Sequence, residues 1–433
     1  MHEERLLERI VAREVRLAVL GQGYVGLTLA CEAAEAGFPT VGIDVDEGRI
    51  AELAQGTAEV PGVDGALVRS ATASGRLTFS TDPSAIGDAD LVFICVPTPL
   101  RDHQPDLSFI EAACADIAQH LRPDSLVVLE STTYPGTTED LVRARLEAGG
   151  RRHGEDFLLA YSAERIDPGN AEFGLRNTPK IVAGVTPDAT QAAVAFYEQL
   201  VDKVVPVSSP RVAETAKLFE NTFRHVNIAL ANEMAILCRE LDIDVWEVVE
   251  AAATKPFGFM PFYPGPGIGG HCIPLDPTYL AWKIREDSGR RFGLLDLAKE
   301  INERMPDYVA TRALEILNQT GRAMKDANVL VLGVTYKPDV GDARETPAIP
   351  TMRALARRGA DVRFHDPFVD RVTLNGTPLE RRDLDEAVAE ADLVVLLTPH
   401  SDYDLERLAA SARIVFDTRN AYRGRRPANV VGL

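Results

Sequence analysis

A cysteine stands in an unusual stretch of sequence between Pro264 and Pro277. The stretch reads PGPGIGGHCIPLDP, so glycines and prolines crowd both sides of Cys272. This composition disfavours both a helix and a central strand, and it predicts a stiff loop throughout. Glycine lets backbone approach a ligand closely, and a thiol presented by such a loop is a candidate nucleophile. The other cysteines fall in apolar helix or strand patterns and are expected in the core: Cys31, Cys95, Cys114 and Cys238.

A glycine-rich turn near the N-terminus is the second candidate site. An apolar strand expected over 16–20 runs into the sequence GQGYVG, and a helix is expected over 27–36. In this context GxGxxG is typical of dinucleotide binding, with the phosphates at the helix N-terminus. The next expected strand, 40–45, carries Asp44 near its end. A carboxylate there accepts both ribose hydroxyls and repels a 2′-phosphate, which favours NAD over NADP. The alternative is that Asp44 caps a helix.

Three further loops with polar residues follow apolar strands. Strands expected over 91–96, 126–129, 157–161 and 180–185 alternate with helices, which predicts a doubly wound parallel sheet across residues 16–210. The loops read CVPTP from Cys95, ESTTYPGTT from Glu130 and SAERIDPG from Ser162. Because ligands bind beyond the carboxyl ends of such strands, these loops are expected to face the ligand. The alternative is three ordinary turns with hydroxyl caps.

A long helix without glycine or proline is expected from about residue 213 to 241. Lys217, Asn221 and Arg224 follow the spacing i, i+4, i+7 and therefore lie on one face. Lysine on a long helix is usually a solvated surface residue. Here the neighbouring Leu218 and Phe219 are apolar, which favours a helix that spans between domains. The region up to residue 312 is expected to be helical apart from the cysteine stretch and to form a subunit interface.

A second α/β unit is expected from residue 328 onward. Strands are expected at 328–333, 361–365, 392–397 and 413–416, with a helix over 347–358. This unit has the alternation of the first but lacks GxGxxG, so we expect it to hold a different nucleotide. Lys337 and Arg344 lie in its first strand-to-helix loop, where an anion would bind.

The composition indicates an ordinary globular protein of two or three domains. The chain has 433 residues and a net charge of −19, which argues against a nucleic-acid partner. Five scattered cysteines without CxxC spacing indicate neither a disulfide framework nor a metal site. The charged N-terminus does not read as a signal peptide, and no apolar run reaches about 18 residues. We therefore expect a cytoplasmic protein without a membrane partner.

Seven motifs together resemble a known family. They occur in the order GQGYVG, CVPTP, ESTTYPGTT, AERIDPG, AKLFEN, GIGGHCIPLDP and YKPDVGDARE. In this order the chain resembles the nucleotide-sugar 6-dehydrogenases, the UDP-glucose/GDP-mannose dehydrogenase family, from about residue 15 to 418. The GGHC form of the cysteine motif is most similar to the UDP-N-acetylhexosamine branch. The implied fold class is α/β, with two Rossmann-like doubly wound parallel-sheet domains joined by a long helix and a helical middle domain.

The resemblance implies oxidation of a sugar C6 alcohol to a carboxylate with two NAD. Cys272 would trap the intermediate aldehyde as a thiohemiacetal, which a second oxidation converts to a thioester that water cleaves. Lys217 and Asn221 would stabilise the oxyanion of each tetrahedral stage. Asp276 would polarise or deprotonate the water or the thiol. Glu164, with Thr132, would orient the hydrolytic water, and truncating Cys272 should halt turnover while leaving binding largely intact.

The same resemblance assigns binding residues by position. The residues assigned to NAD are Gly21, Gly23, Tyr24, Val25, Gly26, Asp44, Arg49, Pro97, Thr98, Thr132 and Arg344. The residues assigned to the sugar nucleotide are Glu164, Arg165, Lys217, Asn221, Phe262, Tyr263, Gly267 and Lys337. Related enzymes often contribute an arginine from the neighbouring subunit just before the cysteine loop. Lys255 occupies that segment here, which leaves the selectivity for the sugar open.

The chain is expected to divide into three domains. A homodimer is expected to form through the middle domain. The domains are an NAD-binding domain over 1–212, a helical central domain over 213–320 and a nucleotide-sugar-binding domain over 321–433. The expected substrate is UDP-N-acetylglucosamine or a UDP-glucose-like sugar, and dTDP-glucose of a secondary-metabolite pathway is an alternative. A two-electron hydroxyacid-type dehydrogenase would not need Cys272. A non-catalytic nucleotide-sugar sensor would have lost Cys272, Lys217 or Asp276, and all three are present.

Overall fold

The computed structural model describes residues 2–57, 60, 63–102, 104–167, 170, 172–270, 272–424 and 426–433. Three residues of the predicted motifs, Pro168, Gly169 and His271, lie outside this part of the chain. The chain divides into two compact units. The first comprises Met1–Glu220 and Thr278–Arg290, and the second Asn221–Pro277 and Arg291–Leu433.

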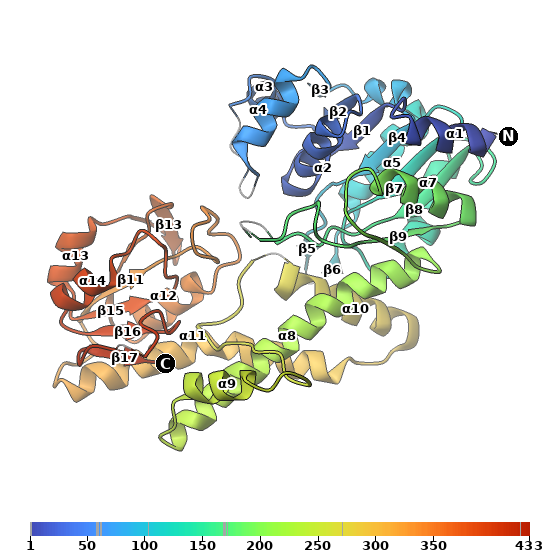
Figure 1. Ribbon diagram of the computed structural model, residues 1–433. Helices are drawn as coiled ribbons and strands as arrows, with labels where there is room; N and C mark the ends of the chain where they lie inside the picture. Colours follow the sequence, from blue (N-terminus) through green and yellow to red (C-terminus); the bar gives the residue numbers. More distant parts are fainter. Residues whose placement is uncertain are drawn as a thin grey trace. The chain divides into compact units, whose positions relative to one another are not determined.

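The first unit is built on an eight-stranded sheet (Figure 1). In spatial order its strands are β10 (Val204–Pro206), β9 (Lys180–Gly184), β8 (Phe157–Tyr161), β7 (Ser125–Leu129), β4 (Leu91–Ile94), β1 (Leu17–Leu20), β2 (Thr40–Ile43) and β3 (Leu77–Ser80). Every pairing is parallel except the one between β8 and β9, which is antiparallel. The strands β1, β4, β7 and β8 are buried along their whole length, because helices cover both faces of the sheet.

Two layers of helices enclose this sheet. Side chains of α1 (His2–Val11), α2 (Tyr24–Glu35), α4 (Gly65–Ala73) and α7 (Pro187–Tyr197) join one core cluster. Side chains of η1 (Pro83–Asp88), α5 (Ser108–His120), η2 (Thr137–Val142) and α6 (Arg143–Glu147) join the other. The helix α3 (Glu47–Ala54) and a short hairpin, β5 (Leu100–Arg101) with β6 (Gln104–Pro105), complete the unit.

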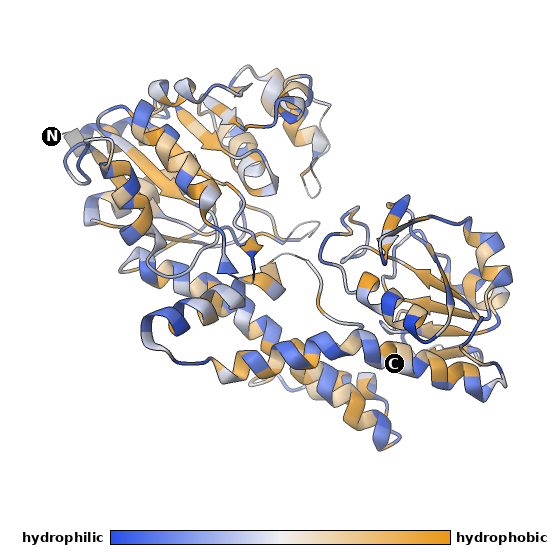
Figure 2. Ribbon diagram, turned by 180° about the vertical axis from the view of Figure 1, so that it is seen from behind, coloured by the Kyte–Doolittle hydropathy of each residue, from blue (hydrophilic) through white to orange (hydrophobic). Residues whose placement is uncertain are grey.

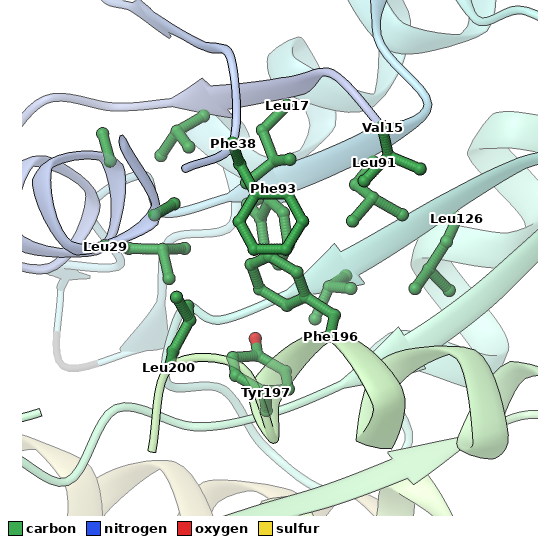
Figure 3. Packing of buried hydrophobic residues seen from close by; sticks show 14 of the residues in the cluster. Val15, Leu17, Leu29, Phe38, Leu91, Phe93, Leu126, Phe196, Tyr197 and Leu200 are labelled. Carbon is green, nitrogen blue, oxygen red and sulfur yellow. The ribbon is translucent and has the colours of Figure 1, made fainter. Parts of the chain in front are cut away.

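Aromatic side chains fill the centre of the first of these clusters. Phe93 of β4 lies with its ring centroid 4.9 Å from that of Phe196 in α7, and Phe196 lies 5.1 Å from Tyr197 (Figure 3). All three are fully buried. Burial of each such ring stabilises the fold by about 1.5–3 kcal/mol, so the end of α7 is firmly attached to the sheet.

The second unit contains a five-stranded parallel sheet. Its order is β12 (Asp361–His365), β11 (Asn328–Leu332), β15 (Leu393–Leu396), β16 (Val415–Asp417) and β17 (Val430–Gly432). Figure 2 shows the strands of both sheets as the most hydrophobic segments. The helix α12 (Ala348–Arg357) packs in one core cluster, α13 (Leu384–Glu390) and α14 (Leu405–Ser411) in the other. A hairpin, β13 (Arg371–Leu374) with β14 (Thr377–Glu380), follows β12.

Four helices account for most of the middle of the chain. They are α8 (Pro210–Glu240), α9 (Val245–Ala253), α10 (Cys272–Ser288) and α11 (Gly293–Gln319). The end of α8 packs against α9 through a small apolar cluster that includes Cys238 and Trp246. No helix in the described part of the chain is long and apolar enough to cross a bilayer.

The predicted α/β class is confirmed, with two local differences. The strand expected over 180–185 forms, but β9 runs opposite to β8, so the first sheet is not parallel throughout. The prediction of a loop up to Pro277 is wrong from Cys272 onward, because α10 begins at that residue. Pro274 is tolerated because the N–H groups of a first turn have no intrahelical acceptor. Pro277 lies inside the helix and gives up one hydrogen bond.

Candidate active site

The GQGYVG sequence forms the turn between β1 and α2. Gly21 has φ +90°, and a methyl group there would lie 2.6 Å from the carbonyl oxygen of Cys95. A methyl group on Gly26 would lie 1.9 Å from the carbonyl oxygen of Gly21, so α2 packs directly on the turn. Gly23 has open space beside it and precedes α2 without any side-chain cap. Tyr24 and Val25, both half-buried, begin the helix. The turn therefore leaves helix N–H groups and space for a phosphate, as NAD requires.

Asp44 follows β2 and holds this turn in place. One carboxylate oxygen accepts hydrogen bonds from Gln22 N at 2.7 Å and from the Arg49 guanidinium at 3.1 Å. The other accepts from Asp46 N at 3.0 Å. Asp46, not Asp44, caps α3 by accepting from Arg49 N. The cap alternative for Asp44 is therefore wrong, and its carboxylate lies next to the glycine-rich turn.

The first two strand-end loops are bonded to each other. Thr98 donates its hydroxyl hydrogen bond to the carbonyl oxygen of Thr132 at 2.9 Å, and Ser131 donates to the carbonyl oxygen of Val96 at 2.7 Å. Tyr279 donates to the carbonyl oxygen of Thr98 at 2.5 Å. Pro97 is exposed beside them. The structure thus brings together, in one unit, loops that lie far apart in sequence.

Glu214, which the sequence analysis missed, anchors the second of these loops. Its carboxylate accepts from Gly136 N at 2.6 Å, from Thr138 N at 2.9 Å and from the Thr138 hydroxyl at 2.7 Å. Burial raises the pKa of Glu214 to about 7 despite these donors. Glu214 lies on α8, three residues before Lys217, and a carboxylate on that face of the helix was the available signal.

Lys217 is a largely buried cation, with 9 % of its surface exposed. Among the residues described, none forms a hydrogen bond or an ion pair with its ammonium group. Arg165 differs, because its guanidinium binds both carboxylate oxygens of Glu220, at 2.6 and 3.2 Å, and the carbonyl oxygen of Pro179. Glu164 is buried and accepts from Arg165 N and Ile166 N, at 2.6 and 2.7 Å. The first unit therefore holds an oriented carboxylate and an unpaired cation.

The second unit carries the cysteine and two of its predicted partners, Asn221 and Asp276. Cys272 is exposed, whereas the four other cysteines are buried. Asn221 donates from its amide to a carboxylate oxygen of Asp276 at 2.6 Å, and both side chains are buried. Asp276 lies one helical turn after Cys272 on α10, so its carboxylate and the thiol lie on the same side of that helix. Arg224, one turn beyond Asn221, is exposed.

The loop before Cys272 rests on the segment between β11 and α12 and on α8. A methyl group on Gly269 would lie 2.7 Å from the Tyr336 side chain, and Gly270 N donates to the carbonyl oxygen of Glu345 at 3.1 Å. Gly265 N donates to the amide oxygen of Asn232 in α8 at 2.9 Å. Gly267, with φ +130°, is buried. These close approaches explain why the loop needs glycine.

The remaining predicted ligand residues of this unit lie around the same loop. Phe262 packs against Phe223 with centroids 5.6 Å apart, and Tyr263 stacks on Trp246 at 5.8 Å. Lys337 is half-buried in the loop after β11. Arg344 pairs with Asp342 at 2.7 Å, so its charge is already compensated.

Arg419 is a second residue that sequence reasoning missed. It follows β16, donates to the carbonyl oxygen of Leu397 at 3.0 Å, and its guanidinium lies against Gly265. No carboxylate in the described part of the chain forms an ion pair with it, and desolvation lowers its pKa to about 10. An uncompensated guanidinium at the end of a strand is typical of an anion site.

Comparison with known proteins identifies the family. Three family models match in succession: the NAD-binding domain of the UDP-glucose/GDP-mannose dehydrogenase family over residues 15–201, its central domain over 211–304 and its UDP-binding domain over 330–424.

Individual relatives match over nearly the whole chain. The UDP-N-acetyl-D-mannosamine dehydrogenase of Pyrococcus horikoshii is 36% identical over 94% of this chain and 96% of its own. The UDP-N-acetyl-D-glucosamine 6-dehydrogenase of Pseudomonas aeruginosa is 34% identical over 94% and 97%. A solved structure of a UDP-D-ManNAc dehydrogenase from P. horikoshii matches with a TM-score of 0.87 at 33% identity, covering 96% of this chain and 98% of that one. The resemblance seen in the motifs and the expected NAD cofactor are confirmed, and the chain belongs to the UDP-glucose/GDP-mannose dehydrogenase family.

Proposed function

We propose that this NAD-dependent nucleotide-sugar dehydrogenase oxidises the C6 alcohol of a UDP-N-acetylhexosamine to the carboxylate, in two oxidations with Cys272 as the nucleophile. The observation that carries the proposal is the contrast among the cysteines: one thiol is exposed and four are buried. That thiol begins a helix one turn before the buried Asn221–Asp276 pair. The acetamido sugar is supported by the similarity to UDP-N-acetyl-D-mannosamine and UDP-N-acetyl-D-glucosamine dehydrogenases and by the GGHC motif.

Each step places a demand on a protein group. NAD, when bound, accepts a hydride in each oxidation. The alcohol gives up a hydride and its hydroxyl proton to become an aldehyde, and the Cys272 sulfur bonds to the aldehyde carbon to give a thiohemiacetal. Loss of the second hydride and of the thiohemiacetal hydroxyl proton gives a thioester, and both hydroxyl protons pass to solvent. Water then adds to the acyl carbon, the carbon–sulfur bond breaks, and the acid and the thiolate separate. Asp276 takes the proton of the thiol, and Glu164, with Thr132, takes the proton of the water.

Lys217 stabilises the oxyanion of the tetrahedral stages. Its ammonium group is largely buried and has no carboxylate partner among the described residues, so its charge is available for a ligand. In a site that excludes water, one such cation contributes several kcal/mol to a developing negative charge. The amide of Asn221 already donates to Asp276, so Asn221 also orients that carboxylate.

NAD binds at the glycine-rich turn of the first unit. Gly21, Gly23 and Gly26 shape the turn, and the open space at Gly23 admits the pyrophosphate. Asp44 accepts the ribose hydroxyls beside Arg49. The full proposed set is Gly21, Gly23, Tyr24, Val25, Gly26, Asp44, Arg49, Pro97, Thr98, Thr132 and Arg344.

The sugar nucleotide engages the cysteine loop and the second α/β sheet. Arg419 and Lys337 are the proposed contacts of the diphosphate. Arg419 forms no ion pair with a carboxylate in the described part of the chain, and Lys337 lies in the first strand-to-helix loop of this unit, where an anion would bind. Phe262, Tyr263 and Gly267 line the loop that holds the nucleotide. Glu164, Arg165, Lys217 and Asn221 are the proposed contacts of the sugar. Lys255 takes the place of the arginine that related enzymes contribute from a neighbouring subunit.

A homodimer forms through the central helices. On α8, Phe223, Leu230 and Leu237 recur every seven residues and are 41, 59 and 46 % exposed. A stripe of large apolar side chains at this spacing is typical of a helix that packs against a partner. A second copy of the chain supplies a matching stripe about a two-fold axis.

The experiment that tests the function measures NADH formed per sugar consumed. UDP-N-acetylmannosamine, UDP-N-acetylglucosamine, UDP-glucose and dTDP-glucose are offered separately to the purified protein. Two NADH per sugar support the four-electron route and name the substrate. One NADH per sugar, with an aldehyde as product, refutes it.

Two cysteine variants complete this test. Cys272→Ala should abolish formation of the acid while NAD and UDP still bind, because no thioester can form. Cys238→Ala, which removes a buried thiol from the same unit, should retain activity. Equal activity of Cys272→Ala and the wild type would exclude the thiol mechanism.

A further inference from the structure

A buried cluster of charges lies at one edge of the first sheet. The Lys180 ammonium is 2.8 Å from a carboxylate oxygen of Glu130 and 3.0 Å from one of Glu164. The three side chains are 2, 0 and 9 % exposed, respectively. Removing ions from water is costly, and pairing with opposite charges offsets this cost. Lys180 is therefore the cation that links two carboxylates in the interior.

The reversed direction of β9 brings Lys180 to this position. Glu130 follows β7 and Glu164 follows β8, both at the carboxyl end of parallel strands. Lys180 is the first residue of β9, which runs antiparallel to β8. The start of β9 therefore lies at the carboxyl end of β8, at the edge where ligands of such sheets bind.

Glu164 is held from two sides. One carboxylate oxygen accepts from Arg165 N at 2.6 Å and from Ile166 N at 2.7 Å. The other accepts from Lys180 at 3.0 Å. Its orientation is therefore fixed by its own loop and by Lys180 together. Arg165 does not share this role through its side chain, because its guanidinium binds Glu220.

The second carboxylate of the cluster has a different environment. One carboxylate oxygen of Glu130 accepts a hydrogen bond from Lys180. The other accepts a hydrogen bond from the hydroxyl of Tyr197, which lies at the end of α7. Burial raises the pKa of Glu130. Burial also opposes ionisation of Glu164, but the charge of Lys180 and the backbone N–H groups lower its pKa below the ordinary value.

Two other buried titratable groups near the cluster stay neutral. Burial raises the pKa of Cys95 after β4 and of Tyr197 well above their usual values. A proton added to the cluster therefore goes to Glu130, and Glu164 keeps its negative charge. This division of roles depends on Lys180.

We propose that Lys180 is a positioning residue for the hydrolytic step, which holds the Glu164 carboxylate ionised and correctly oriented to take a proton from the attacking water. The proposal rests on the function proposed above, in which water cleaves the Cys272 thioester. In that step the water oxygen bonds to the acyl carbon, its proton passes to Glu164, and the thiolate of Cys272 leaves as the carbon–sulfur bond breaks. Lys180 touches neither the substrate nor the water.

The test uses Lys180→Met, which keeps the length of the side chain and removes its charge. We expect both NADH molecules of the first turnover to form, after which the acyl-enzyme accumulates and steady-state turnover falls at least about tenfold. Intact mass of the quenched protein detects the acyl group. The acid limb of the turnover profile should move up by about one pH unit or more, because a cation near Glu164 is lost. Hydroxylamine, which cleaves thioesters without a base, should restore turnover.

Glu130→Gln is the matched variant and moves the profile in the opposite direction. It leaves Lys180 with Glu164 as its one carboxylate partner in the cluster, so hydrolysis should persist and the acid limb should move down. A wild-type pH profile and no acyl-enzyme in Lys180→Met would overturn the proposal. If Lys180→Met does not fold, an unchanged or raised acid limb in Glu130→Gln overturns it instead. One NADH per sugar in the wild type would refute the proposed function itself, which is a separate outcome.

Discussion

Replacing glycines of the first turn separates their contributions to folding and to NAD binding. In Gly21→Ala the new methyl group would lie 2.6 Å from the carbonyl oxygen of Cys95 and 2.9 Å from its carbon, at a residue with φ +90°. The backbone strain costs about 1–3 kcal/mol, and the overpacking costs about 1–3 kcal/mol more. Gly21→Ala should therefore destabilise the fold by about 2–6 kcal/mol.

Gly23→Ala is the matched control, two residues away. Gly23 has φ −79°, and nothing lies within 4 Å of where its methyl group would be. Replacing glycine at this helix N-cap should lower the free energy of unfolding by at most about 1 kcal/mol. The methyl group would instead occupy the space through which we propose that the pyrophosphate approaches the turn. We expect NAD binding to weaken at least about tenfold, which corresponds to about 1.4 kcal/mol.

Thermal unfolding and NAD titration of both variants distinguish the two effects. Gly21→Ala should lower the unfolding temperature by several degrees, and Gly23→Ala should leave it within about two degrees of the wild type. Both should bind NAD more weakly. An unchanged unfolding temperature in Gly21→Ala would refute the reasoning from crowding at Cys95. Wild-type affinity in Gly23→Ala would show that the pyrophosphate does not pass this glycine.

Two further predictions concern stability and assembly. The raised pKa of Glu214, about 7 against an ordinary 4.5, means that its proton-linked stabilisation is present below about pH 4.5 and is lost as the pH rises through 7. The stability of the wild type relative to Glu214→Gln should therefore fall by about 2–3 kcal/mol between pH 5 and 8, and parallel denaturation curves would contradict this. Leu230→Glu with Leu237→Glu should convert the proposed dimer to a monomer in light scattering. Val45→Glu, at an exposed apolar residue of the first unit, should not, and an unchanged mass of the double variant would exclude α8 as the interface.

Local sequence accounted for the parts of the site that depend on the backbone. The glycine-rich turn was predictable because only glycine fits φ +90° at Gly21 and the contact of α2 at Gly26. The exposed thiol of Cys272 was predictable because no apolar periodicity surrounds it. The start of α10 at that residue was not, because prolines in a first turn are compatible with both loop and helix.

Buried polar partners were missed because they come from distant parts of the chain. Glu214 anchors the loop at Gly136 and Thr138, which lie far from it in sequence. Arg419 lies against Gly265, and nothing in the local sequence distinguishes it from a surface residue. Lys180 opens an apolar strand, a position that is usually solvated. Lys180 is buried because the antiparallel pairing of β9 with β8 places it beside Glu130 and Glu164, and the local sequence does not predict this pairing.

The amino-acid sequence by itself determined the alternation of strands and helices, the NAD-type turn and the family, because these depend on hydrophobic period and on short motifs with strict backbone needs. The tertiary structure alone decided the direction of β9, the pairing of Lys180 with Glu130 and Glu164, and the attachment of the cysteine loop to Tyr336 and Asn232. The physical reason is that burial and pairing of a charge depend on which distant segments pack together. A local pattern reports the shape of the backbone but not the partner that compensates a buried ion.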